Sequence, residues 1–211
     1  MKIYLHQNDL PNDLPFLSEN FKGEVAVDTE AMGLMTERDR LCLIQISEGN
    51  GDCHLVQFSP ESLSSVKVPN LKKLFENPNV LKIFHFARFD VTIVKKYLDI
   101  TIQPLFCTKI ASKLVRTYTD RHGLKDLCKF FLNHEISKEQ QTSDWGNPIL
   151  TQEQLSYAAT DVLYLHQLKE ALTLLLIREG RLEMAQGCFS FLPTLASLAA
   201  QGFNVDEIIK Y

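Results

Sequence analysis

Two carboxylates separated by one residue end a short apolar segment near the N-terminus. The segment covers residues 25–27, and Asp28-Thr29-Glu30 follows it directly. Because side chains alternate across a strand, we expect Asp28 and Glu30 to leave the same face close together. Like charges about 4 Å apart repel by roughly 4 kcal/mol at an effective dielectric near 20, so such a pair holds a cation or takes up a proton. These oxygen ligands suit Mg²⁺ or Mn²⁺, although two solvated acids at a strand end would give the same pattern.

Three further residues, which lie later in the chain, complete a possible metal centre with Asp28 and Glu30. Asp90 falls in the first turn of a predicted helix, where the helix dipole favours a carboxylate. Tyr157 and Asp161 are four residues apart, which places them on one face of another predicted helix. Two divalent ions about 3.5–4 Å apart need several carboxylates from separate elements, and the four acids can supply them. Periodicity alone does not show that these residues converge.

The elements expected to position these residues alternate between strands and helices. Strands are predicted at 2–6, 25–28, 41–47, 52–58 and 80–84. Helices are predicted at 70–77, 108–115, 124–132 and 151–178, with a last short helix bracketed by Gly180 and Gly187. A further helix is predicted to have Asp90 in its first turn and to run to about residue 98. The turn at residues 49–51 makes its two flanking strands antiparallel. The predicted fold class is therefore α/β, with a mixed sheet and helices packed on it.

Composition limits the classes of protein to consider. The 211 residues are 45% hydrophobic, which is enough for one domain with a sizeable core. The net charge of −4 argues against a non-specific binder of long nucleic acid, so a nucleic-acid substrate should be short or held locally. Five cysteines without a C-x-x-C pair indicate reduced thiols rather than a disulfide framework or zinc knuckle. No apolar run is long enough for a membrane span, so we expect a cytoplasmic protein.

Three short motifs carry a family resemblance. They are Asp28-x-Glu30, His85-x-Ala87-x-Phe89-Asp90 and Tyr157-x-x-x-Asp161. In this order they resemble the three motifs of the DEDDy 3′-5′ exonucleases, in the ribonuclease D-like branch, and the loop at residues 143–145 is similar to that branch too. The stretches 82–90 and 106–125 further resemble the nanoRNase C family, the short alphaproteobacterial enzymes that degrade RNA dinucleotides.

The resemblance implies both a fold and an activity. The fold would be ribonuclease H-like (DnaQ-like), as one 3′-5′ exonuclease domain over residues 1–211 without an HRDC or other accessory domain. The reaction would be hydrolysis of short RNA, above all dinucleotides such as pGpG, to nucleoside 5′-monophosphates with two Mg²⁺ or Mn²⁺ ions. The family would also make the protein a ring-like homo-octamer.

Carried over by position, the resemblance assigns roles to individual residues. The four acids that become metal ligands are Asp28, Glu30, Asp90 and Asp161. Tyr157 would orient the attacking water, Leu34 would be an apolar wedge against the substrate bases, and His85 matches the histidine of the second motif. Phe86 departs from the pattern, because many members have Asn there, which puts a substrate hydrogen bond from this position in doubt. Leu34 and His85 could instead be core residues.

A basic stretch in the middle of the chain offers contacts for the substrate's other phosphate, since Arg can grip a phosphate with two parallel hydrogen bonds. The candidates are Arg88, Arg116, Arg121, His122 and Lys125. The alternative interpretation is a solvated basic loop or a subunit contact. Trp145 could stack on a base or anchor its own loop.

Three other functions remain open at this point. The same chemistry would serve ribonuclease D-like trimming of longer RNA, or a DNA exonuclease, because the sequence does not reveal the preference for a 2′-hydroxyl. A catalytically inactive binding module is disfavoured, because all four acids and Tyr157 are present. Apolar residues gathered near the C-terminus predict self-association.

Overall fold

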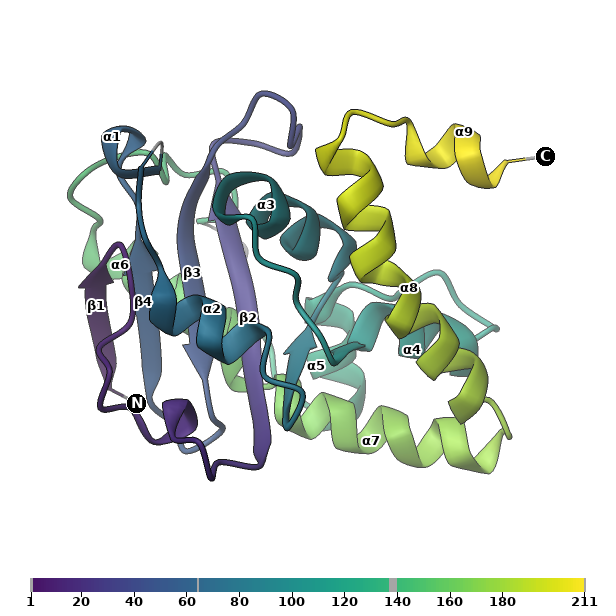
Figure 1. The fold of residues 1–211 in the computed structure, drawn as a ribbon. Coiled ribbons are helices and arrows are strands. Elements are labelled where there is room, and N and C mark those ends of the chain that lie inside the picture. The colour runs from purple at the N-terminus through teal and green to yellow at the C-terminus, as the bar shows by residue number, and fades with distance from the viewer. Residues whose placement is uncertain (1, 64, 137–139, 211) are drawn as a thin grey trace.

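The structure, a computed structural model, describes residues 2–63, 65–136 and 140–210. Its strands form one sheet in the order β1-β4-β3-β2-β5-β6 (Figure 1). The strands are β1 Ile3–Gln7, β2 Gly23–Ala31, β3 Leu41–Ser47, β4 Cys53–Gln57, β5 Val80–Phe84 and β6 Leu105–Cys107. The β2–β3 and β3–β4 pairs are antiparallel, and the β1–β4, β2–β5 and β5–β6 pairs are parallel. The predicted mixed sheet is confirmed.

Helices lie on both faces of this sheet (Figure 1). They are η1 Pro15–Leu17 (a 3-10 helix), α1 Pro60–Leu63, α2 Pro69–Phe75, α3 Arg88–Leu98, α4 Thr108–Val115, α5 Leu124–Leu132, α6 Gln152–Leu163, α7 Leu165–Arg178, α8 Leu182–Ala200 and α9 Val205–Ile209. Helix α6 contacts β2, β3 and β4 on one face, while α3 lies on the other and packs along α8. Within the described ranges no helix has both the length and the apolar character needed to cross a membrane.

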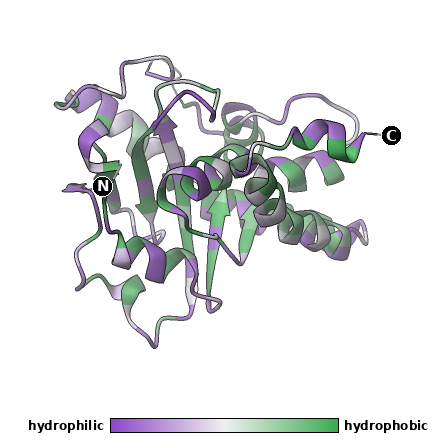
Figure 2. Cartoon of the chain, turned by 45° about the horizontal axis from the view of Figure 1, so that its top comes forward, coloured by the Kyte–Doolittle hydropathy of each residue, from purple (hydrophilic) through white to green (hydrophobic). Residues whose placement is uncertain are grey.

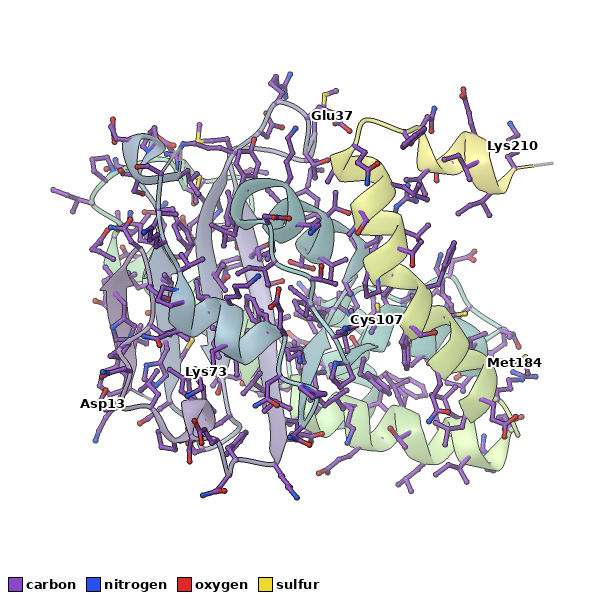
Figure 3. All side chains as sticks on the ribbon, in the orientation of Figure 1. Asp13, Glu37, Lys73, Cys107, Met184 and Lys210 are labelled. Atoms are coloured by element: carbon purple, nitrogen blue, oxygen red, sulfur yellow. The ribbon has the colours of Figure 1, made fainter. Side chains whose placement is uncertain are left out.

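The core follows from the sequence of the central strands. Every residue of β3 is buried, as expected for a strand covered on both faces. Figure 2 shows hydrophobic colour concentrated along the strands, and Figure 3 shows side chains filling the space between sheet and helices, with Cys107 in the interior. The turn between β3 and β4 uses Gly49 and Gly51, whose φ angles of 85° and 92° favour glycine.

The prediction of one continuous helix over residues 151–178 is wrong. Thr151 does begin the helix with a capping box. The Thr151 hydroxyl accepts a hydrogen bond from the backbone N–H of Gln154, and the Gln154 side chain accepts one from the backbone N–H of Thr151. The helix ends at Leu163, however, and a second helix begins at Leu165. The interruption lets α6 pack over the central strands and α7 follow a separate path along β5 and α4.

The short helix predicted between Gly180 and Gly187 is also wrong. Helix α8 runs from Leu182 to Ala200, through Gly187 and Pro193. A glycine inside a helix costs about 1 kcal/mol and a proline about 3 kcal/mol. Helix α8 buries its own Phe189, Leu192 and Leu195 against the rest of the protein. Each buried side chain of this size contributes roughly 1.5–3 kcal/mol. Tertiary packing therefore outweighs both helix-breaking residues.

Candidate active site

Three carboxylates converge where β2 meets α6. Asp28 and Glu30 come from β2 and Asp161 from α6, and one carboxylate oxygen from each lies within 4.8 Å of the others. Asp90, in the first turn of α3, reaches the same strand end, where its Oδ1 accepts a 2.7 Å hydrogen bond from Thr29 Oγ1. The structure thus brings together the acids that the sequence singled out.

Burial and mutual repulsion govern the protonation of these acids. Burial raises the pKa of Asp28 well above its usual value, and the charges of Asp90, Asp161 and Glu30 raise it further. Burial, followed by repulsion from Asp161 and Asp90, likewise raises the pKa of Glu30. In the described part of the chain no Lys, Arg or His forms an ion pair with any of the four. Without a cation, the cluster therefore retains protons.

The chemistry of this donor set fits a divalent cation. All the atoms that converge are carboxylate oxygens, the ligands that Mg²⁺ and Mn²⁺ prefer. A bound cation would replace the protons and remove the repulsion that raises the pKa values. We therefore regard the four acids as residues that could hold divalent metal.

Tyr157 lies one helical turn before Asp161 in α6, on the same face of that helix. Burial raises the pKa of Tyr157 strongly, and the charges of Asp161, Glu30 and Asp28 raise it further. The side chain is therefore a phenol near neutral pH, able to orient a water but not to act as a tyrosinate base.

Trp145 supports Tyr157 from the loop before α6. Its side chain is buried, with its ring centroid 6.1 Å from that of Tyr157. The side-chain amide of Gln154 ties the loop to α6, because its Nε2 donates to Ser143 Oγ and to the Asp144 carbonyl, both at 3.0 Å. This burial favours the loop-anchor interpretation of Trp145.

Leu34 is presented to solvent by a tight loop after β2. Its side chain is 86% exposed, so it is not a core residue. Asp39 closes the loop by accepting a 3.0 Å bond from the Met35 amide. Gly33 has no room for a side chain, because a Cβ there would lie 2.2 Å from Asp39 Oδ2. An exposed apolar side chain four residues beyond Glu30 suits the predicted wedge, a role that stays a prediction.

His85 and Phe86 lie between β5 and α3, shortly before Asp90 in the chain. His85 Nδ1 lies 2.9 Å from Thr108 Oγ1, whose hydroxyl donates to the Phe84 carbonyl at 3.2 Å. Because that hydroxyl has one proton, Nδ1 of His85 is assigned as the donor in their bond. Phe86 is 49% exposed with a φ of 64°, and Lys109 Nζ lies 3.8 Å above its ring.

The three predicted arginines have different surroundings in the structure. Arg88 pairs with Asp206 of α9 at 2.9 Å. Arg116 is buried beneath its loop, where it lies 4.4 Å from the Phe130 ring and donates to the Arg121 carbonyl at 2.6 Å. Arg121 itself is exposed. Arg116 thus shapes the loop in this chain, and direct contact of these arginines with substrate stays a prediction.

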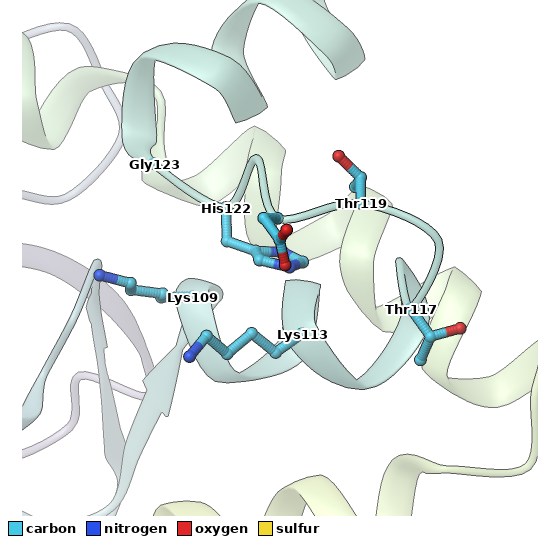
Figure 4. A pocket seen from close by; sticks show the side chains of 7 residues that line it. Lys109, Lys113, Thr117, Thr119, His122 and Gly123 are labelled. Carbon is cyan, nitrogen blue, oxygen red and sulfur yellow. The ribbon is translucent and has the colours of Figure 1, made fainter.

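His122 belongs to a cationic cavity beside α4 (Figure 4). The cavity has a volume of about 610 Å³ and is lined by Lys109, Lys113, Thr117, Thr119, Asp120, His122 and Gly123. Figure 4 shows Lys109 and Lys113 extending from the same helix. Neither lysine was among the predicted site residues, although their spacing of four on a predicted helix would have placed them on one face.

A model of the family described as 3′-5′ exonuclease matches residues 3–177. The chain belongs to the 3′-5′ exonuclease family. Within it, this exonuclease is of the ribonuclease D and NrnC type, because it is similar to solved structures of NrnC and to curated ribonuclease D proteins.

The exonuclease is 48% identical to Brucella melitensis NrnC with bound Mg²⁺, with a TM-score of 0.87 over 96% of this chain and 95% of that one. It is 49% identical to Brucella melitensis NrnC bound to pGG, with a TM-score of 0.86 and the same coverage. Ribonuclease D of Acidiphilium cryptum (strain JF-5) is 35% identical over 159 residues, which make up 75% of this chain and 39% of that protein. The chain thus spans about two fifths of the length of the curated relatives it matches.

Proposed function

We propose that the chain hydrolyses short RNA from the 3′ end, preferentially dinucleotides such as pGpG, and releases nucleoside 5′-monophosphates. The observation that carries this proposal is the convergence of Asp28, Glu30 and Asp161 within 4.8 Å, with Asp90 at the same strand end. The Brucella melitensis NrnC structure with pGG supports a short RNA substrate. The highly exposed Leu34 supports it as well, because an apolar side chain there could pack against a base.

The four acids would hold two Mg²⁺ or Mn²⁺ ions. When bound, such a pair supplies an activated water and neutralises charge on the scissile phosphate. Tyr157 keeps its proton, and its position one helical turn before Asp161 puts the phenol beside the carboxylates, where it can orient the attacking water. Asp90 is held in turn by the hydroxyl of Thr29.

The cavity beside α4 would receive the substrate's other phosphate. Lys109 and Lys113 supply charge, and the His122 ring is fixed by a 2.9 Å bond between its Nδ1 and Ser112 Oγ. Lys109 also contacts Phe86, in the segment that leads to Asp90, so the cavity adjoins that segment. Ribonuclease D-like trimming of longer RNA is the second candidate, supported by the curated relatives.

The test is turnover of 5′-phosphorylated RNA oligomers of two to seven nucleotides with Mg²⁺ or Mn²⁺. We expect the two-mer to be cleaved far faster than the seven-mer and the Asp28→Ala variant to be inactive. Rates that stay equal or rise with length would contradict the dinucleotide preference and favour general 3′-end trimming. Turnover by Asp28→Ala would refute the metal centre.

The cavity has its own test. Substituting Lys109→Ala and Lys113→Ala together should raise KM for a 5′-phosphorylated dinucleotide about 10-fold or more, equivalent to at least 1.4 kcal/mol, and leave kcat nearly unchanged. KM for the dinucleotide without that phosphate should change little. Lys73→Ala is the control, because Lys73 is an exposed lysine of α2 that does not line the cavity. An equal effect on both substrates would contradict the assignment.

We also propose that the chain acts in the cytoplasm as a homo-oligomer, an octamer on the family resemblance. Support comes from apolar side chains that remain exposed near the C-terminus, namely Phe191, Phe203, Ile208 and Ile209. Light scattering should give a multiple of the 24.1 kDa chain mass. A mass equal to one chain would contradict self-association.

A further inference from the structure

Gln45 in β3 is a fully buried polar residue without a hydrogen-bond partner for its side chain. Its exposed fraction is 0%, and neither the amide nitrogen nor the amide oxygen has a partner among the described residues. Buried amides are almost always hydrogen-bonded, because leaving one unpaired forfeits its bonds to water. Such an exception in a well-packed strand calls for a functional explanation.

The strand register places Gln45 beside the metal centre. Gln45 is the direct cross-strand partner of Asp28 in the antiparallel β2–β3 pair, and its other neighbour is Leu55 of β4. Residues directly opposite one another share a face of the sheet, with Cβ atoms about 4.5–5.5 Å apart. Helix α6, which carries Asp161, packs against the same three strands. Gln45 therefore lies next to a predicted metal ligand, out of contact with solvent.

Asp28 has unused capacity to accept a hydrogen bond. An ionised carboxylate offers about four lone-pair positions for hydrogen bonds or metal ions. A bound cation would keep this carboxylate ionised, and the lone-pair positions that it left free would need a donor. Carboxylates that ligate metals are commonly oriented by such a hydrogen bond.

We propose that Gln45 is a positioning residue of the metal centre, and that its amide N–H donates to the Asp28 carboxylate when metal is bound. The inference rests on the proposed function, because it needs divalent metal at the four acids. Gln45 acts through Asp28 and does not touch the reacting atoms.

A matched control lies on the neighbouring strand. Gln57 of β4 is also buried and lies on the same face of the sheet, two residues beyond Leu55. Its amide is fully engaged, since it donates to the Asn147 carbonyl at 3.0 Å and accepts from Gln7 at 3.0 Å. Replacing either glutamine by Met keeps the length of the side chain and removes the amide.

The experiment is calorimetric titration of Mn²⁺ into the wild-type chain, Gln45→Met and Gln57→Met, with the Tm of each metal-free protein measured in parallel. We expect Gln45→Met to bind Mn²⁺ about 10–100-fold more weakly, with a metal-free Tm equal to or above that of the wild type. Gln57→Met should have a lower Tm and the wild-type affinity.

Two results for Gln45→Met would overturn the proposal. They are an unchanged Mn²⁺ affinity, and a weakened affinity accompanied by a lower metal-free Tm, which would assign Gln45 to folding alone. If the wild-type chain itself failed to bind Mn²⁺, the proposed function would fall together with this inference. That outcome is distinguishable, because it appears before any variant is compared.

Discussion

Two neighbouring strands carry ionisable side chains that are shielded from solvent, Lys82 fully and Asp28 and Glu30 in part, and they treat these groups in opposite ways. Lys82 of β5 is fully buried, and its ammonium donates to the carbonyls of Asn77, Val80 and Gln103 at 3.0, 2.7 and 2.6 Å. Three donors thus meet three acceptors supplied by the fold itself. On β2, which pairs with β5, the carboxylates of Asp28 and Glu30 instead face other carboxylates.

The comparison separates a structural buried charge from a functional one. Lys82 ties the start of β5 to the segment that enters β6, and its donors have acceptors within the fold. The acid cluster lacks a compensating basic group among the described residues, so these residues do not neutralise its negative charge. A buried group left in this state is typical of a binding site.

The largest effect should follow a change to the acid cluster. Asp28→Asn keeps the shape of the side chain but removes a metal ligand, so kcat/KM should fall about 10³-fold or more. The metal-free protein should be more stable than the wild type, because repulsion is relieved. Glu24→Gln is the control, since Glu24 lies on the same strand and pairs with Lys169 at 2.8 Å. Activity of Asp28→Asn within tenfold of the wild type would contradict a metal ligand at this position.

The next effect concerns catalysis without metal binding. Tyr157→Phe removes the hydroxyl that is proposed to orient the attacking water and should lower kcat by about 10²-fold. Mn²⁺ affinity, measured by calorimetry, should stay close to that of the wild type. A variant with normal turnover would show that Tyr157 only packs against Trp145.

Lys82 offers the converse test, on stability rather than activity. Lys82→Met leaves three carbonyls without their donor and should cost about 3 kcal/mol of unfolding free energy. At a temperature where the variant remains folded, kcat should match that of the wild type. Denaturant unfolding gives the first quantity and steady-state turnover the second. A loss of kcat with intact stability would break the distinction between the two sites.

The last effect is a pH dependence of opposite sign at the two sites. Burial raises the pKa of Glu30 to about 9 from 4.5, so the metal-free folded state binds more protons than the unfolded state between these values. Its contribution to stability is therefore lost as pH rises through this window. Burial lowers the pKa of Lys82 to about 7 from 10.5, so its contribution grows as pH rises from 7 to 10.5.

These two slopes can be separated by measuring Tm against pH in the presence of a chelator. Glu30→Gln should flatten the fall on the alkaline side of pH 4.5, and Lys82→Met should remove the rise above pH 7. Mn²⁺ at about 100 times its Kd should add about 2.7 kcal/mol and reduce the dependence due to Glu30. A metal-free Tm that rises from pH 5 to 7 in the wild type and falls in Glu30→Gln would contradict this account.

Much of the fold and of the acid cluster could be predicted, because short-range sequence patterns determine them. The alternation of residues in β2 placed Asp28 and Glu30 on one face, and the spacing of Tyr157 and Asp161 on a helix was confirmed. The 3′-5′ exonuclease family and its mixed sheet were predicted as well. The sheet and the shared faces follow from local periodicity, whereas the family was implied by the resemblance that the motifs carry.

What could not be predicted depends on tertiary packing. Strand β6 has three residues, too few for a periodic signal, and it is defined by pairing with β5. Helix α8 continues through Pro193 because of what it buries. The same limit applies to Arg116, whose charge indicated a phosphate contact while its position beneath a loop is set by Phe130. Gln45 had no signal of its own without the strand register.

The most direct test of the central claim is anomalous scattering from a crystal of the protein soaked in Mn²⁺. The account predicts two peaks about 3.5–4 Å apart, enclosed by Asp28, Glu30, Asp90 and Asp161. A single peak would contradict the proposed pair of ions. Absence of any peak at these acids, in a crystal that binds Mn²⁺ elsewhere, would contradict the metal centre itself.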